Sequence, residues 1–249
     1  MPVTDLAFYL VAVPAILIVG ISKGGFGGGL ALVGVPLMSL VIPPAQAAAV
    51  MLPILICMDA VGVGAYRKRF DRPTLRVMLP GSIVGIAIGG LMFGILDSSS
   101  MRLVIGIIAL VFVGHYFVGG GRLRPPAEPN PVFGAICGGL AGFTSTLAHA
   151  GGPPAQMYLL PLKLDKTVYV ATSVVLFAII NLVKLVPYAL IGQFVLPNLW
   201  TSLVLAPLAP VGMLLGIWLH TRVEQALFYR LAYVFVAITG VKLIYDGLS

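Results

Sequence analysis

The stretches SKGGFGGG at residues 22–29 and TSTLAHAGGPP at residues 144–154 each interrupt a long apolar segment of this chain. We call them the first and the second glycine motif. Glycine frees the backbone from helical geometry, and irregular backbone at membrane depth is tolerated only where protein or a water-filled cavity surrounds it. Such interruptions at matching positions of two halves point to the binding site of a transporter.

The composition places the chain among integral membrane proteins. Of its 249 residues, 59% are hydrophobic and 9% are charged, and the mean hydropathy is +1.07. A soluble domain could not bury that much apolar surface. Helices of about 17–25 apolar residues cross a bilayer, and we predict spans at residues 46–66, 74–96, 102–118, 168–190, 199–219 and 227–245. We therefore expect an all-α membrane protein without a soluble domain.

The net charge of +7 comes from basic residues in short loops between the predicted spans. They are not interleaved with exposed aromatic residues, so we attribute them to orientation in the bilayer and not to nucleic-acid binding. Cys57 and Cys137 lie in apolar segments, without neighbours at metal-ligand spacing. We expect no metal and no cofactor.

The chain contains an internal repeat when residues 6–118 are laid against 131–245 at a spacing of about 122 to 128. The matching positions include Gly28-Gly29 with Gly151-Gly152, Asp59 with Asn181, Tyr66 with Tyr188, and the pair Gly85 and Gly89 with Gly212 and Gly216. The polar, proline-rich stretch 119–131 has the composition of a linker. We therefore divide the chain into a first half at 1–118, a cytoplasmic linker at 119–131 and a second half at 132–249.

The loop charges predict that the two halves are inverted. RKRFDR at 67–72 is basic, whereas its counterpart IGQFVLP at 191–197 is uncharged, and KLDK at 163–166 is basic opposite an uncharged loop at 42–46. Positive loops stay cytoplasmic. Residues 5–41 and 131–161 would then form broken-helix hairpins, each followed by three transmembrane helices, with both termini outside. A plain hydropathy count gives eight spans instead.

In this layout the two glycine motifs meet near the midplane, where helix N-termini and free backbone amides favour an anion. We predict a substrate site formed by Ser22, Lys23, Gly24, Gly25, Gly28, Gly29, Thr144, Ser145, Thr146, His149, Gly151 and Gly152. Asp59, Asn181 and Lys184 are candidates for coupling or gating, because ionisable groups in a membrane are usually functional.

Structural roles are open for the same residues. Asp59 can simply pair with Lys23 or Lys184, and the Ser and Thr hydroxyls can bond back to helix carbonyls. His149 can carry a proton or act as a structural donor.

The segments SKGGFGGGLALVGVP at 22–36, AGFTSTLAHAGGPP at 141–154 and RKRFDRP at 67–73, with the spaced Gly81, Gly85 and Gly89, resemble the sulfite exporter TauE/SafE family over nearly the whole chain. Members are bacterial cytoplasmic-membrane permeases, and those with assigned roles mostly move sulfite, organosulfonates or related anions. In the second glycine motif, His149 and Ala150 replace part of the usual glycine run, which leaves the substrate open.

The resemblance implies a secondary transporter, an exporter of small sulfur-containing anions that works by alternating access. Its expected partners are the anion and the lipid bilayer, and GxxxG-like spacings allow a homodimer. An anion channel and a cation transporter that uses Asp59 are the alternatives. We expect no enzyme, because the sequence shows no nucleophile and base at suggestive spacing and no phosphate loop.

Overall fold

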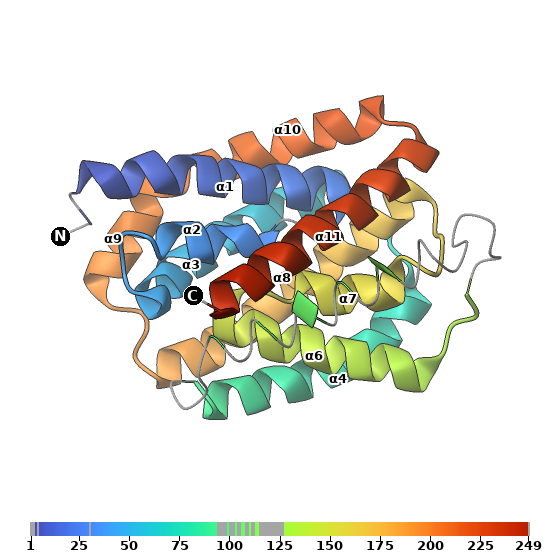
Figure 1. Cartoon of the computed structure of the whole chain (residues 1–249), viewed down its shortest axis with the longest axis horizontal. Coiled ribbons are helices and arrows are strands. Elements are labelled where there is room, and N and C mark those ends of the chain that lie inside the picture. Colours follow the sequence, from blue (N-terminus) through green and yellow to red (C-terminus); the bar gives the residue numbers. More distant parts are fainter. Residues whose placement is uncertain are drawn as a thin grey trace.

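The computed structural model describes residues 3, 5–29, 31–93 and 127–248, together with isolated positions 99, 103, 106, 107, 110, 113 and 114. In these residues every regular element is a helix. The first half holds α1 (Leu6–Phe26), the 3-10 turn η1 (Ala31–Val33), α2 (Gly34–Met38), α3 (Pro44–Ala65) and α4 (Arg72–Leu91). The second half holds α6 (Pro131–Ala148), α7 (Gly152–Leu159), α8 (Lys166–Leu190), α9 (Leu196–Leu205), α10 (Leu208–Arg222) and α11 (Gln225–Leu248). The predicted all-α class is confirmed (Figure 1).

Five of the described helices, α1, α3, α4, α6 and α8, are long and apolar enough to cross a membrane, and α9 with α10 makes a sixth span if the pair is counted as one. Large apolar side chains such as Leu91 and Leu190 are exposed on the outer surface. Such a surface suits lipid and not water. The protein is therefore a multi-pass membrane protein.

The predicted span at 199–219 corresponds to α9 and α10 together. The structure has two helices there, bent by 43° between Leu205 and Leu208. Pro207 lies at the bend, and its ring clashes with the preceding turn while it lacks an N–H for the helical ladder. Most of the predicted span 102–118 and most of the 119–131 linker lie outside the described residues.

Each glycine motif interrupts a helix, but the non-helical segment is shorter than the motif itself. Ser22–Phe26 form the last turn of α1, and the helix ends at Gly27, which has φ +67°. Thr144–Ala148 likewise finish α6, which ends at His149 with φ +52°. Left-handed residues of this kind commonly terminate helices. We call residues 27–29 the first break and residues 149–151 the second break.

The arms of the two expected hairpins differ in length. Helix α1 has 21 residues, about 31 Å at 1.5 Å per residue, which is enough to cross the hydrocarbon core. The returning helices α2 and α7 have only five and eight residues. They reach only part of the way back.

Two pairs of helices are packed backbone to backbone through glycine. A Cβ on Gly24 would lie 2.4 Å from the carbonyl oxygen of Met213, which joins α1 to α10. A Cβ on Gly85 would lie 1.9 Å from the carbonyl oxygen of Gly139, which joins α4 to α6. Small residues permit this approach, as they do in other membrane helices. Each pair therefore joins a helix of one half to a helix of the other.

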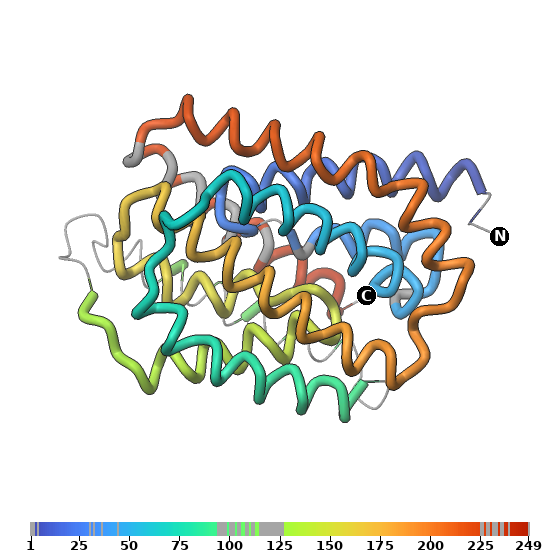
Figure 2. Tube along the Cα trace, turned by 180° about the vertical axis from the view of Figure 1, so that it is seen from behind, coloured from blue at the N-terminus to red at the C-terminus, as the bar shows by residue number. Residues whose placement is uncertain are grey.

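The contacts also give the directions of the helices. Gly20 lies against Gly212 and Gly25 against Gly216, so α1 and α10 are parallel. In the same way α4 and α6 run parallel to each other. Figures 1 and 2 show that the α4–α6 pair runs opposite to the α1–α10 pair, and that α3 and α8 lie between the two pairs. The centre of the protein is therefore formed by α3, α8 and the two breaks.

Substitution of Gly85 by alanine should lower the stability of the protein, because the added methyl group meets the α6 backbone. Alanine normally stabilises a helix relative to glycine by about 0.5–1 kcal/mol. Gly64→Ala is the matched control, since nothing lies within 4 Å of its Cβ position. Thermal unfolding in detergent should show a lower midpoint for Gly85→Ala and an equal or higher one for Gly64→Ala. Equal behaviour of the two variants would contradict the close packing.

Candidate functional site

The two breaks meet at the centre of the molecule. A Cβ on Gly152, the first residue of α7, would lie 2.9 Å from the carbonyl oxygen of Gly28. A cavity beside this contact offers about 20 Å³ to the centre of a water molecule, enough for about one water. The residues that line this central cavity are Lys23, Gly28, Ala31, Leu55, Ser145, His149, Gly152, Phe177 and Asn181.

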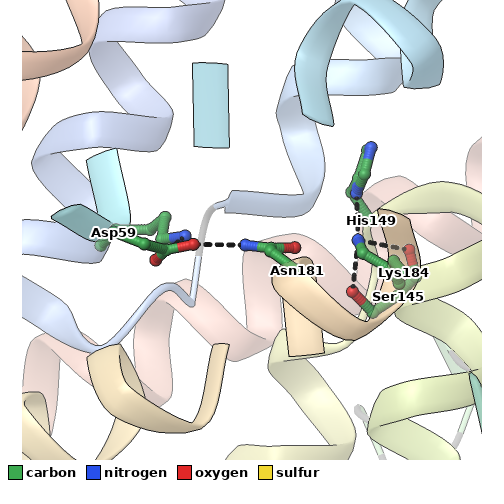
Figure 3. Close-up of polar contacts among 6 residues, drawn as sticks. Asp59, Ser145, His149, Asn181 and Lys184 are labelled. Carbon is green, nitrogen blue, oxygen red and sulfur yellow. Dashed lines mark hydrogen bonds and ion pairs between the residues drawn. The ribbon is translucent and has the colours of Figure 1, made fainter. Parts of the chain in front are cut away.

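Lys23, Asp59 and Asn181 form a buried chain of polar contacts on one side of the central cavity. The Lys23 ammonium from the last turn of α1 lies 2.6 Å from one oxygen of Asp59 on α3. Asn181 on α8 donates to the other oxygen of Asp59 at 2.6 Å (Figure 3). The side chains of Lys23 and Asp59 are only 4% and 5% exposed. A buried ion pair needs such further hydrogen bonds to offset the loss of hydration, and Asn181 supplies one.

Lys184 forms a second buried cluster with the end of α6. Its ammonium donates to the carbonyl oxygen of Ser145 at 3.1 Å and to the Ser145 hydroxyl at 3.0 Å. The third contact is the Nδ1 atom of His149 at 2.7 Å (Figure 3). An ammonium has three donors, so all the donors of Lys184 are used.

The contacts of His149 fix its tautomer. Since Nδ1 accepts from Lys184, the proton of the neutral ring lies on Nε2, which is 3.0 Å from the carbonyl oxygen of Ala48. We assign this tautomer from the hydrogen-bond network. Both ring nitrogens therefore have protein partners, and His149 holds Lys184 in place from the second break.

The structure brings together only part of the predicted site. Lys23, Gly28, Ser145, His149, Gly152 and Asn181 line the central cavity. Thr144 and Thr146 instead donate their hydroxyls to the carbonyl oxygens of Leu140 and Gly142, one turn earlier in α6. These two residues adopt the structural role that the sequence left open.

The remaining predicted residues are buried but are not among those that line the cavity: Ser22, Gly24, Gly25, Gly29 and Gly151, with Asp59 and Lys184 just behind it. Gly24 and Gly25 belong to the helical end of α1 and pack against α10. Their amides are therefore not freed by the first break. Gly151 packs against α6, where an added Cβ would lie 2.6 Å from the carbonyl oxygen of Ala141.

Two buried tyrosines, Tyr66 and Tyr188, complete the surroundings of the cavity, and neither was predicted from the sequence to belong to the site. The Tyr66 hydroxyl donates to the carbonyl oxygen of Gly24 at 2.6 Å, and the Tyr188 hydroxyl donates to that of Thr146 at 2.9 Å. Both bonds join residues 42 positions apart. The match of Tyr66 with Tyr188 in the internal repeat is the sequence signal that could have identified them. The apolar lining residues Leu55 and Phe177 carry no sequence signal that separates them from other core residues.

The formal charges of Lys23, Asp59 and Lys184 around the cavity do not cancel. Two ammonium groups and one carboxylate give a formal excess of one positive charge in apolar surroundings. At the start of α7, Pro153 and Pro154 have no N–H, so Gly152, which lines the cavity, is the residue there whose amide can face a ligand. Among the residues that the structure describes, no group of three or more His, Cys, Asp or Glu residues could hold a metal ion.

Residues 12–243 match the protein family described as Sulfite exporter TauE/SafE. The chain belongs to this family. The match includes both glycine motifs and nearly all the described helices, which confirms the resemblance seen in the sequence. No curated protein and no solved structure matches the chain. Because TauE/SafE is a family of exporter-type transporters, this member is a membrane transporter.

Removal of Asp59 should destabilise this TauE/SafE protein strongly, because Lys23 would remain as an unpaired charge in the interior. Losing one partner of a buried pair costs about 3–5 kcal/mol. In a double-mutant cycle, the variant that carries both Lys23→Met and Asp59→Leu should lose much less stability than the two single variants lose in sum. Thermal unfolding in detergent measures the four proteins. Additive losses would show that the ion pair is energetically unimportant.

Proposed function

We propose that the protein is a secondary transporter of small sulfur-containing anions, such as sulfite or organosulfonates, and that it exports them across a bacterial cytoplasmic membrane. The observation that carries the proposal is that Lys23, ion-paired with Asp59, lines the central cavity beside the two breaks. Family membership supports an anion exporter, and the excess positive charge supports an anion as the ligand. The proposed mechanism is alternating access around this cavity.

In the proposed bound state the anion lies against Lys23 and takes over part of its contact with Asp59. A sulfur oxyanion has several oxygens that accept hydrogen bonds, and the lining offers the Ser145 hydroxyl, the Gly152 amide and the Asn181 amide as donors. Asn181 can keep hold of Asp59 when Lys23 turns to the substrate. Lys184 would act through its charge, because its three donors are occupied.

The arrangement of the helices supports an inverted repeat and a rocking motion. Each half contributes its first long helix to a glycine-packed pair with the other half, and the two pairs run in opposite directions (Figures 1 and 2). Tyr66 and Tyr188 make equivalent hydrogen bonds, one to the end of α1 and the other to the end of α6, as expected for two related halves. Two equivalent halves around one site are the usual basis of alternating access.

The cavity favours a carrier over the two alternatives from the sequence. A space with room for about one water suits an occluded state and not an open channel, and the site must widen to admit an anion. Asp59 already has Lys23 and Asn181 as partners. Its carboxylate is therefore poorly placed to serve as a cation ligand.

Flux of sulfite, sulfate, thiosulfate and short sulfonates into liposomes tests the substrate and the site together. We expect saturable flux of at least one of these anions in the wild type. Lys23→Ala should weaken anion binding about tenfold to 100-fold, because a hydrogen bond to a charged group contributes about 1.5–3 kcal/mol.

Lys242→Ala is the matched control, since Lys242 is also an ion-paired lysine but lies on α11, where it pairs with Asp246. It should transport like the wild type. The proposal fails if the wild type moves none of the four anions, and the assignment of Lys23 fails if both lysine variants behave alike.

Asp59→Asn separates anion transport from cation transport. Loss of the negative charge should tighten anion binding about tenfold, because Asp59 no longer competes for Lys23 or repels the substrate. Release should slow, since Lys23 has no carboxylate to return to. Binding and efflux of the transported anion measure both effects, with Asp246→Asn as the control. A cation transporter would instead lose cation flux in Asp59→Asn and show no anion flux in either protein.

A further inference from the structure

Helix α8 presents one buried face along its whole length. Tyr169, Ser173, Phe177, Asn181, Lys184 and Tyr188 follow one another at intervals of three or four residues, so they share one side of the helix. All six are buried, and we call them the α8 stripe. Phe177 and Asn181, in its middle, line the central cavity. The stripe therefore extends from the cavity toward both ends of α8.

The half of the stripe nearer the start of α8 runs along the first break. A Cβ on Gly27 would lie 2.5 Å from the ring of Tyr169, and one on Gly28 would lie 3.9 Å from the ring of Phe177. Ser173 lies one turn from each of these aromatic residues. It therefore faces the first break, between the positions of Tyr169 and Phe177.

Two buried polar groups near this segment have no hydrogen-bond partner among the described residues. They are the hydroxyl of Ser173 and the Oε1 atom of Gln156, whose residues are 1% and 0% exposed. The Gln156 amide nitrogen donates to the carbonyl oxygen of Gly27 at 3.5 Å, which places Gln156 at the same break. Buried polar groups are nearly always paired with protein or ordered water, so these two groups require an explanation.

Ordinary helix chemistry does not explain Ser173. Buried hydroxyls in helices usually donate to the carbonyl one turn earlier. Ser82 and Thr172 of this protein do so, at 2.9 Å and 2.7 Å. On the other side of the cavity, Lys184 and Tyr188 have their donors satisfied by the end of α6. The unsatisfied groups of the stripe region thus lie on one side of the cavity.

We infer that Ser173 and Gln156 mark a polar path by which the hydrated anion passes between the central cavity and the end of α8 that begins at Lys166. The inference rests on the proposed transport function. The Ser173 hydroxyl can donate to an anion or to its water shell, and the Gln156 amide can accept from and donate to the same waters. The path leads to the basic 163–166 segment, which the charge pattern predicts to be cytoplasmic. An exporter would load its substrate from this side.

Cysteine labelling tests whether water reaches the path. Ser173→Cys in liposomes should react with a water-soluble thiosulfonate reagent that carries a sulfonate group about tenfold faster than Ser82→Cys. Ser82 is the matched control, because it is equally buried but its hydroxyl is already bonded within α4. The parent protein gives the background from Cys57 and Cys137. Equal rates at the two positions would overturn the path.

Transport kinetics test what the path does. The double variant Ser173→Ala with Gln156→Leu should lower the rate of sulfonate or sulfite flux about tenfold, while the equilibrium Kd of that anion changes by less than about twofold. Ser82→Ala should leave both unchanged. Thermal unfolding in detergent confirms that each variant is folded, and the single Ser173→Ala variant serves if the double variant is not.

The outcomes separate this inference from the proposed function. Wild-type flux in a folded variant contradicts the path, and so does a loss of binding equal to the loss of flux, since it would place the two residues in the binding site. If the wild type moves none of the anions, the proposed function fails. A labelling rate at Ser173→Cys no faster than at Ser82→Cys is the result that rejects the path independently of any substrate.

Discussion

A helix that ends inside a membrane must have its free backbone groups satisfied by protein, and the structure is arranged around two such ends. At the end of α1, the carbonyl oxygens of Gly24 and Gly25 lie within hydrogen-bond distance of Tyr66, which directly follows α3, and of His220 on α10. At the end of α6, those of Ser145 and Thr146 accept from Lys184 and Tyr188 on α8. Helices α3, α8 and α10 are thus tied to the centre by the groups that the breaks leave free.

The same constraint places positive charge at the cavity. The C-terminal end of a helix carries partial negative charge and favours cations. Lys23 lies in the last turn of α1, and Lys184 reaches the end of α6 from α8. With Asp59 as the counter-charge of Lys23, the cluster has a formal excess of one positive charge. The groups that stabilise the two helix ends therefore also give the centre of the protein its formal excess of positive charge.

The sequence could predict the helical class and the location of the breaks, because hydropathy and glycine act locally. It also matched Asp59 to Asn181, and these residues are in contact. It could not predict which hydroxyls face the cavity. Thr144 and Ser145 are neighbours, yet the direction around α6 turns one toward its own backbone and the other toward Lys184. The bend at Pro207 was missed because proline is tolerated within many membrane helices.

The sequence by itself determined the membrane class, the family and the residue types of the proposed anion site, since these depend on composition and on short motifs. Only the tertiary structure decided the partners. Lys23 and Asp59 are 36 positions apart, and His149 and Lys184 are 35 apart. Their pairing depends on how α1 lies against α3 and on how the end of α6 lies against α8. Packing of this kind is a property of two surfaces together, and neither segment specifies it alone.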